Sequence, residues 1–277
     1  MDQIINKSFR TEKEIKEMHP AELRRALAAG EIGPLAMGTA GLCPGFVQAN
    51  LVLFDREYES EFEDFAQQNE KVFPILEKLE NTPYTSVVAN HANILTDLPL
   101  YNIWIDGRLT RQTPDATEYW QDGMVAYLIG SSLSFDSDLI DAGIGMRHIS
   151  LGCQIPIYMT NIETKPSMKG TFHGPLFVSM RPVYARKLAL LSEITAKFPR
   201  MHGEPLQIGS PEKIGIGDIM SPAIGEAIYI TEGEIPVFWP SGISVQAAIA
   251  FSKIPFAITQ AASNMLVTDL MNETLSL

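Results

Sequence analysis

The chain has 277 residues, of which 45% are hydrophobic, so it can bury a substantial core as one large domain or two smaller ones. Acidic residues number 33 and basic residues 21, which gives a formal net charge of −12. A negative surface repels phosphate backbones and anionic lipid headgroups, so we expect neither nucleic acid nor a membrane as a partner.

Cysteine content and hydropathy indicate the cellular compartment of the protein. Cys43 and Cys153 are too few for a disulfide framework and lack the paired spacing of a structural zinc site. The N-terminal segment lacks an apolar core of signal-peptide length, and Lys253 interrupts the most apolar late stretch. We therefore expect a cytoplasmic protein.

Two short helices are the first elements predicted along the chain. Thr11 followed by Glu14 forms a capping-box pattern, and a second helix begins at Pro20 and ends at Gly30. A loop rich in glycine and proline then leads into a strand before residue 54.

The middle of the chain is predicted to contain an amphipathic surface helix and a hairpin. Residues 57–79 have helical spacing that Pro74 kinks or ends. Asp106 and Gly107 readily adopt the positive φ angles of a hairpin turn.

Helices and strands alternate along the rest of the chain. The predicted helices are 119–143, 183–198 and 244–251, and the predicted strands are 156–161, 175–180, 206–209, 227–230, 235–239 and 255–259. This alternation, without an internal repeat, predicts an α/β protein.

The segment Thr39 to Leu51 reads TAGLCPGFVQANL and is the most specific motif of the chain. It resembles the signature loop of the D-glutamate cyclase family, also called the putative hydro-lyase family. The resemblance continues in family order through TDLPLY, WQDGMVAYLIGSSLSF, RHIS, YMTN, GPLFVSMRP, HGEPLQIG, IGIGDI, GEIPVFWPSG and MLVTDL. It covers roughly residues 21–270, which makes coincidence an inadequate explanation.

The resemblance implies a fold and an activity. The family fold is a three-layer α/β sandwich with an inserted, smaller two-layer α+β module, which we place at 113–201, with 1–112 and 202–277 forming the larger domain. The implied reaction is the dehydration of D-glutamate to 5-oxo-D-proline, in which the α-amine attacks the γ-carboxyl and water is lost. We predict no cofactor and no metal, and whether the chain forms a homo-oligomer stays open.

Two arginines match family positions and are candidate carboxylate ligands. Because the whole chain is acidic, a site for a small carboxylate substrate must be built locally from a few cations and backbone N–H groups. Arg147 and Arg181 can each hold a carboxylate through two parallel N–H bonds. The alternative is that each arginine makes a structural ion pair.

Histidines and carboxylates in matched blocks are candidates for proton transfer. His202 and His148 titrate near neutral pH and can exchange a proton with an amine or a leaving hydroxyl, although either can instead bond only to backbone. Asp218 and Glu234 can orient a histidine or bind the substrate ammonium, and carboxylates in such turns also cap helices.

The signature loop supplies neutral hydrogen-bonding groups. Its glycines allow backbone N–H groups to approach an anion, and Thr39, Gln48 and Asn50 are candidate substrate contacts. A tight structural crossing in which these side chains satisfy buried backbone is the alternative.

Several positions depart from the family pattern. Ser131 and Ser241 stand where the family usually has cysteine, and Gln260 and Asn264 stand where it usually has histidine. A hydroxyl is a weaker nucleophile than a thiolate, and an amide cannot titrate. We therefore keep three hypotheses: an enzyme acting on a small amino-carboxylate or its lactam, a paralogue that binds a small carboxylate without turnover, and a hydrolase of another cyclic amide.

Overall fold

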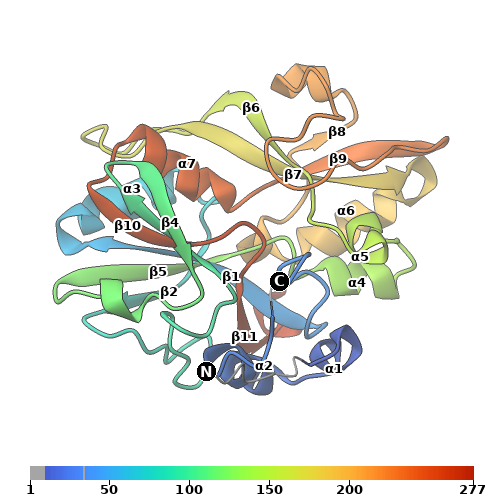
Figure 1. The fold of residues 1–277 in the computed structure, drawn as a ribbon. Helices are drawn as coiled ribbons and strands as arrows, with labels where there is room; N and C mark the ends of the chain where they lie inside the picture. The colour runs from blue at the N-terminus through green and yellow to red at the C-terminus, as the bar shows by residue number, and fades with distance from the viewer. Residues whose placement is uncertain (1–9, 34) are drawn as a thin grey trace, which may run out of the picture.

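Two antiparallel β-sheets form the framework of the protein, and helices pack around and between them (Figure 1). The structure is a computed structural model that describes residues 10–33 and 35–277. The larger, seven-stranded sheet has the order β2-β5-β1-β10-β3-β4, with β11 also paired to β1. Its strands are β1 (Phe46–Asp55), β2 (Ile75–Glu80), β3 (Tyr101–Ile105), β4 (Arg108–Thr113), β5 (Met124–Gly130), β10 (Phe256–Gln260) and β11 (Leu266–Met271).

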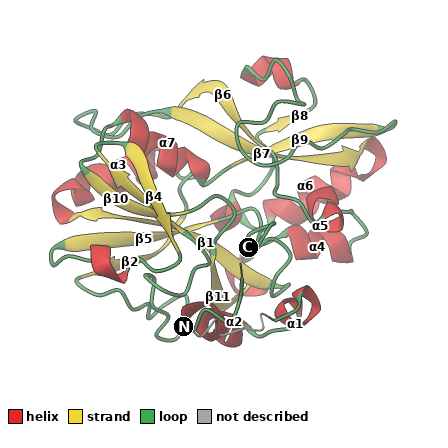
Figure 2. Ribbon diagram, viewed as in Figure 1, coloured by secondary structure: helices red, strands yellow, loops and turns green. Residues whose placement is uncertain are grey.

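The smaller sheet has four strands in the order β6-β7-β9-β8. These are β6 (Ile157–Glu163), β7 (Pro175–Tyr184), β8 (Gln207–Ile208) and β9 (Glu234–Pro240). The α-helices of the described residues are α1 (Glu12–Lys16), α2 (Pro20–Ala28), α3 (Glu59–Gln68), α4 (Asp136–Asp141), α5 (Arg147–Leu151), α6 (Leu188–Ala196) and α7 (Ile243–Phe251). Figure 2 shows α4, α5 and α6 grouped together beneath the smaller sheet. The prediction of a mixed α/β protein is confirmed.

Local turn and cap chemistry fixed several elements as predicted. In the capping box of α1, the Thr11 N–H donates to Glu14 Oε2 at 2.7 Å and the Glu14 N–H donates to Thr11 Oγ1 at 3.4 Å. In the hairpin that joins β3 and β4, Asp106 and Gly107 have φ angles of 50° and 69°. Both predictions are confirmed.

The predicted helix at 119–143 is wrong. Residues 124–130 form β5, which is buried along its whole length between β1 and β2. A strand buried on both faces is a continuous apolar run without alternation, so its sequence does not distinguish it from a buried helix. Only the short α4 follows within the predicted range.

Other predicted boundaries also moved. No strand forms at 227–230, where Tyr229 is 74% exposed and the backbone is irregular. The helix expected over 183–198 is shorter because β7 continues to Tyr184. The helix expected over 57–79 ends at Gln68, and β2 begins directly after Pro74. β11 was not predicted.

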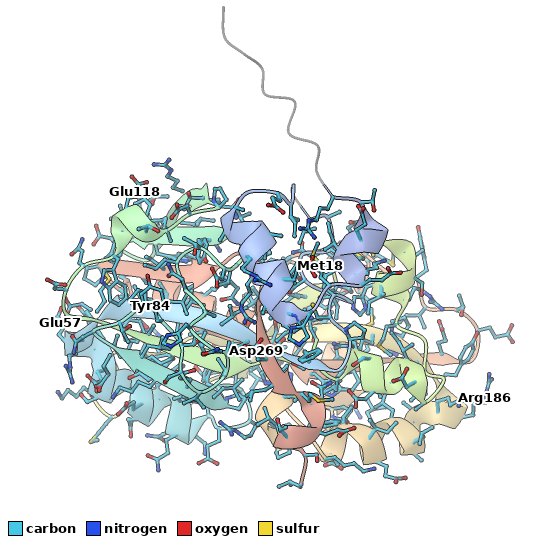
Figure 3. All side chains as sticks on the ribbon, turned by 90° about the horizontal axis from the view of Figure 1, so that it is seen from below. Met18, Glu57, Tyr84, Glu118, Arg186 and Asp269 are labelled. Atoms are coloured by element: carbon cyan, nitrogen blue, oxygen red, sulfur yellow. The ribbon has the colours of Figure 1, made fainter. Side chains whose placement is uncertain are left out.

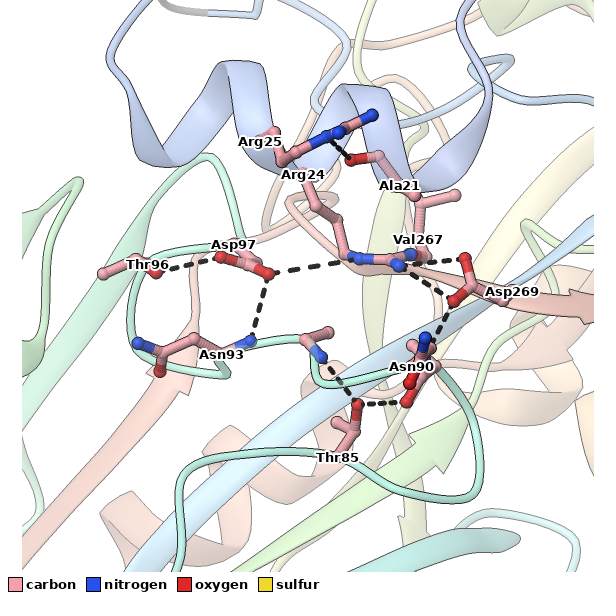
Figure 4. Close-up of polar contacts among 12 residues, drawn as sticks. Ala21, Arg24, Arg25, Thr85, Asn90, Asn93, Thr96, Asp97, Val267 and Asp269 are labelled. Atoms are coloured by element: carbon pink, nitrogen blue, oxygen red, sulfur yellow. Dashed lines mark hydrogen bonds and ion pairs between the residues drawn. The ribbon is translucent and has the colours of Figure 1, made fainter.

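A buried arginine fastens the N-terminal helices to the larger sheet. The Arg24 guanidinium on α2 donates two bonds of 2.9 Å to the carboxylate of Asp269 on β11 and one of 2.8 Å to the carbonyl of Val267 (Figure 4). Asp97 lies 4.0 Å from Arg24 Nε, and its pKa is raised because burial disfavours the charged form. This arrangement holds α2, β11 and the 90–97 loop together.

The division into domains at 113 and 201 stays a prediction. The sheets themselves follow other limits. Strands β1 to β5 belong to the larger sheet and β6 to β9 to the smaller one, although β8 and β9 lie beyond residue 201. Among the helices of residues 10–33 and 35–277, none is long and apolar enough to cross a membrane.

Candidate functional site

An enclosed cavity of about 20 Å³ lies where segments of both sheets meet. A cavity of this size holds about one water-sized group. It is lined by Ser131, Ser132, Leu133, Ile155, Ile157, Ser179, His202, Ser241, Gly242, Ile243, Ser263 and Met265. These residues come from the segment after β5, from β6 and β7, from the β9–α7 junction and from the loop before β11. Serine hydroxyls and one imidazole therefore supply the polar side chains of the cavity.

His202 is the titratable side chain among these lining residues. It follows a 3-10 turn at Pro199–Met201 and has a left-handed backbone with φ of 77°. Its Nδ1 lies 2.9 Å from the carbonyl oxygen of Lys71. Since a carbonyl can only accept, Nδ1 carries the proton in the neutral ring and Nε2 carries the lone pair.

The second ring nitrogen of His202 is a buried acceptor. Nε2 has no hydrogen-bond partner among the described residues. Burial lowers the pKa of His202 to about 4, and the nearby charges of Arg181 and Lys71 act in the same direction. At neutral pH His202 therefore presents an unprotonated nitrogen in a site screened from water.

A buried ion pair stands behind the cavity wall. Arg181 Nε donates to Asp136 Oδ1 at 2.7 Å, and its two terminal nitrogens donate to Ser179 Oγ and Ser132 Oγ, each at 3.3 Å. His148 Nε2 lies 3.1 Å from Asp136 Oδ2. Burial raises the pKa of Asp136, but Arg181 and His148 outweigh burial and hold it below its usual value. Arg181 is therefore linked to the cavity by its hydrogen bonds to Ser132 and Ser179, which both line it.

Arg181 differs from its expected setting in one respect. It lies within β7, opposite Val237 of β9, whereas the strand predicted at 175–180 would have ended just before it. Its guanidinium lies over the rings of Phe135 and Trp239, with its central carbon 5.5 and 5.1 Å from the ring centroids. The residue is fully enclosed.

The signature loop is tied together by its own side chains. Thr39 Oγ1 donates to Gln48 Oε1 at 2.7 Å and accepts from the Met265 N–H at 3.1 Å. Gln48 Nε2 donates to the Thr39 carbonyl at 2.9 Å. Both side chains satisfy loop groups one layer outside the cavity lining.

Asn50 lies directly behind the cavity. It donates to the Gly130 carbonyl at 3.1 Å and accepts from Gln260 Nε2 at 2.6 Å. A Cβ atom on Gly242 would lie 2.0 Å from Asn50 Oδ1, so only glycine allows this approach of the cavity wall. Gln260, one of the departures from the family pattern, is therefore a structural partner of Asn50.

Three candidate residues lie away from the cavity. Arg147 forms a two-pronged ion pair with Glu234, with Nη1 2.8 Å from Oε2, and both line a separate pocket of about 390 Å³. Arg186, which lines the same pocket, lies at the outer edge of the molecule in Figure 3. Asp218 is exposed and accepts from the Met220 N–H at 2.8 Å. Their roles in substrate binding or catalysis stay predictions.

The cavity also contains residues that the sequence did not single out as site residues. Ser132 and Ser179 line it and accept from Arg181, which in turn donates to Asp136. Ser263 has a left-handed φ of 62°, and its buried Oγ has no partner in the part of the chain that the structure describes. Isolated serines have no spacing pattern of their own, so only their position in motif-rich blocks could have indicated them.

Comparison with known proteins gives one family. A family model described as D-glutamate cyclase matches residues 125–269. A "Putative hydro-lyase" from Cupriavidus pinatubonensis is 44% identical over 91% of this chain and 92% of its own length. Proteins of the same name from Pseudomonas syringae pv. tomato and Agrobacterium fabrum are 43% and 41% identical, over 87% and 90% of this chain and 90% and 93% of their own lengths.

A solved nitrogen repressor-like protein from Methanococcus jannaschii aligns with a TM-score of 0.39 at 10% identity, over 90% of this chain and 97% of its own. A score this low supports no conclusion about the fold.

The two sheets and the buried cavity between them define a mixed α/β protein with an imidazole at a serine-lined cavity. The chain belongs to the D-glutamate cyclase family, and the relatives described above carry the name "Putative hydro-lyase". The family resemblance seen in the sequence is confirmed.

Proposed function

We propose that this protein is a hydro-lyase that acts on a small amino-carboxylate, with D-glutamate as the first candidate, at the cavity beside His202. The observation that carries the proposal is the buried Nε2 of His202, a residue of the cavity lining, which has no partner within residues 10–33 and 35–277. A general base must be deprotonated and within reach of the proton that it removes.

The residues at the cavity match the demands of the cyclisation. His202 Nε2 takes a proton from the α-ammonium, and the freed amine attacks the γ-carboxyl carbon to form the lactam C–N bond. One hydroxyl of the Ser132–Ser179 pair donates to the oxygen that becomes negative. The second N–H proton passes to one oxygen of the former γ-carboxylate, which becomes a hydroxyl. The protonated His202 then gives its proton to this hydroxyl, the C–O bond breaks, and the products are 5-oxo-D-proline and water.

The cavity size adds a requirement to this mechanism. A volume of about 20 Å³ takes one functional group of the substrate. Binding of the whole molecule therefore requires lining side chains such as Leu133 and Met265 to move aside, as closed active sites commonly require.

The activity is tested by incubating the purified protein with D-glutamate and with 5-oxo-D-proline, and by following their interconversion with chiral chromatography. We expect turnover that falls at least about a hundredfold in His202→Ala, in keeping with loss of a general base. His173→Ala is the matched control because His173 is exposed and outside the cavity lining. No conversion of either compound, or an unchanged rate in His202→Ala, would contradict the proposal.

A second candidate is a paralogue that binds a small carboxylate without turnover. Two features of the cavity support it. Among the described lining residues His202 alone is titratable, and Ser131 and Ser241 stand in place of the usual family cysteines. A rise in Tm with D-glutamate or another small carboxylate, without conversion, would favour this function, because a ligand of the native state stabilises it.

The finer architecture belongs to the same proposal. The family resemblance supports a three-layer sandwich with an inserted two-layer module, and limited proteolysis near residues 113 and 201 would test the two boundaries.

A further inference from the structure

A large open pocket lies on the other side of His202. Its volume is about 840 Å³, within the range of pockets that bind whole organic ligands. Apolar groups form much of its wall: Ala66, Phe73, Pro74, Ile75, Ala196 and Pro199. These come from the end of α3, the segment leading into β2, the end of α6 and the turn before His202. Among the described lining residues, His202 is the one shared with the enclosed cavity.

Charged groups of both signs also line this pocket: Glu63, Glu70, Lys71, Arg200 and Glu204. Glu63 is already neutralised, since Lys78 Nζ lies 2.8 Å from its Oε1. Two carboxylates and two cations remain, so the pocket carries balanced charge around an apolar wall.

The four remaining charges are available to a ligand. Glu70 and Glu204 form no ion pair within the described residues. Arg200 anchors one nitrogen on the Ile75 carbonyl at 2.9 Å, which fixes its guanidinium at the pocket while other N–H groups remain free to donate. Desolvation lowers the pKa of Lys71, and the nearby Glu204 carboxylate acts in the opposite direction.

We propose that this open pocket is a separate binding site for a zwitterionic amino acid with an apolar side chain. Lys71 and Arg200 bind its carboxylate, Glu70 and Glu204 bind its ammonium, and the apolar wall takes its side chain. Balanced charges of both signs complement a zwitterion better than a simple anion or cation. The pocket is also much larger than free glutamate needs, and its apolar wall can contact a larger side chain.

This proposal does not depend on turnover at the cavity. Binding here uses residues of α3, the β2 approach and α6, and the two sites share His202. Ser132→Ala changes a residue that lines the enclosed cavity and not the open pocket, so it should slow conversion of D-glutamate while leaving binding in the open pocket within about threefold of wild type.

Phenylalanine is a suitable probe, and three analogues each lack one feature. Isothermal titration calorimetry should show saturable binding of D- or L-phenylalanine at one site per chain. Phenylethylamine lacks the carboxylate, 3-phenylpropionate lacks the ammonium, and glutamate lacks the apolar side chain. Each should bind this pocket at least about tenfold more weakly, since each lacks one of the three groups that the pocket contacts.

Two variants place the binding in the pocket. Ala196→Trp fills it from the end of α6 and should abolish phenylalanine binding. Lys71→Ala keeps the backbone carbonyl that holds His202 and should weaken binding about tenfold, whereas Lys197→Ala removes an equal charge outside the pocket lining and should not.

The proposal is overturned if neither enantiomer of phenylalanine binds, if the three analogues bind equally well, or if binding survives in both Ala196→Trp and Lys71→Ala. If D-glutamate is converted but phenylalanine does not bind, only this proposal falls. If phenylalanine binds as described but neither D-glutamate nor 5-oxo-D-proline is converted, the proposed reaction falls and this site stands.

Discussion

Replacing His202 with glutamine should make the protein less sensitive to mild acid. The His202 ring is buried, and its pKa is lowered from 6.5 to about 4 in the folded protein. As the pH falls below 6.5 the unfolded chain takes up a proton on this residue while the folded chain does not. Stability is therefore complete above pH 6.5 and is lost as the pH falls toward 4.

The size of this effect follows from the two pKa values. At pH 5 the unfolded imidazole is almost fully protonated and the folded one almost fully neutral, which corresponds to a loss of about 2 kcal/mol relative to pH 7. Glutamine cannot titrate, and its amide can still donate to the Lys71 carbonyl that accepts from Nδ1. His202→Gln should therefore lack this contribution and keep all others.

Equilibrium urea unfolding at pH 7 and pH 5 measures the difference. The wild type should lose about 2 kcal/mol more free energy of unfolding between these pH values than His202→Gln loses. His91→Gln is a control, because His91 is exposed on a loop. Equal losses in wild type and His202→Gln would refute both the buried neutral ring and its assignment as the base.

Two further predictions concern packing around the sheets. Arg24→Met removes the buried partner of Asp269 and should lower the free energy of unfolding by about 3 kcal/mol in urea titrations; a loss below about 1 kcal/mol would contradict the clamp. Gly242→Ala forces a Cβ to within 2.0 Å of Asn50 Oδ1 and should cost about 3 kcal/mol, whereas Gly217→Ala, which meets nothing within 4 Å, should cost less than about 1 kcal/mol by the same measurement. Similar values for the two alanine variants would count against close packing at Asn50.

The sequence predicted those elements whose signals are local. The Asp106-Gly107 turn and the Thr11 cap depend on a few adjacent residues, and both formed as expected. β5 depends on its neighbours β1 and β2, which bury both of its faces, so its own pattern carried no period. Sheet pairing between distant segments is not encoded in any one segment.

The candidate site, too, could be predicted from the sequence only in part. Family motifs identified His202 and the signature loop, but they did not reveal which matched residues share a chamber. Arg147 and Glu234 satisfy each other elsewhere, while Asn50 lies directly behind the cavity wall. Partner choice among buried polar groups depends on three-dimensional neighbours, which spacing along the chain does not specify.

The position of Arg181 explains how an acidic protein can offer a site for developing negative charge. Asp136, 2.7 Å away, compensates the buried guanidinium, so the cavity carries no large net charge. Arg181 donates to Ser132 Oγ and Ser179 Oγ, so each of these hydroxyls must turn its own hydrogen elsewhere. The two oxygens lie 3.4 Å apart, and one hydroxyl can donate to the other while the second donates into the cavity. The chamber thus combines an oriented donor with the acceptor Nε2 of His202. This pairing fits a group that loses a proton at one atom and gains negative charge at another.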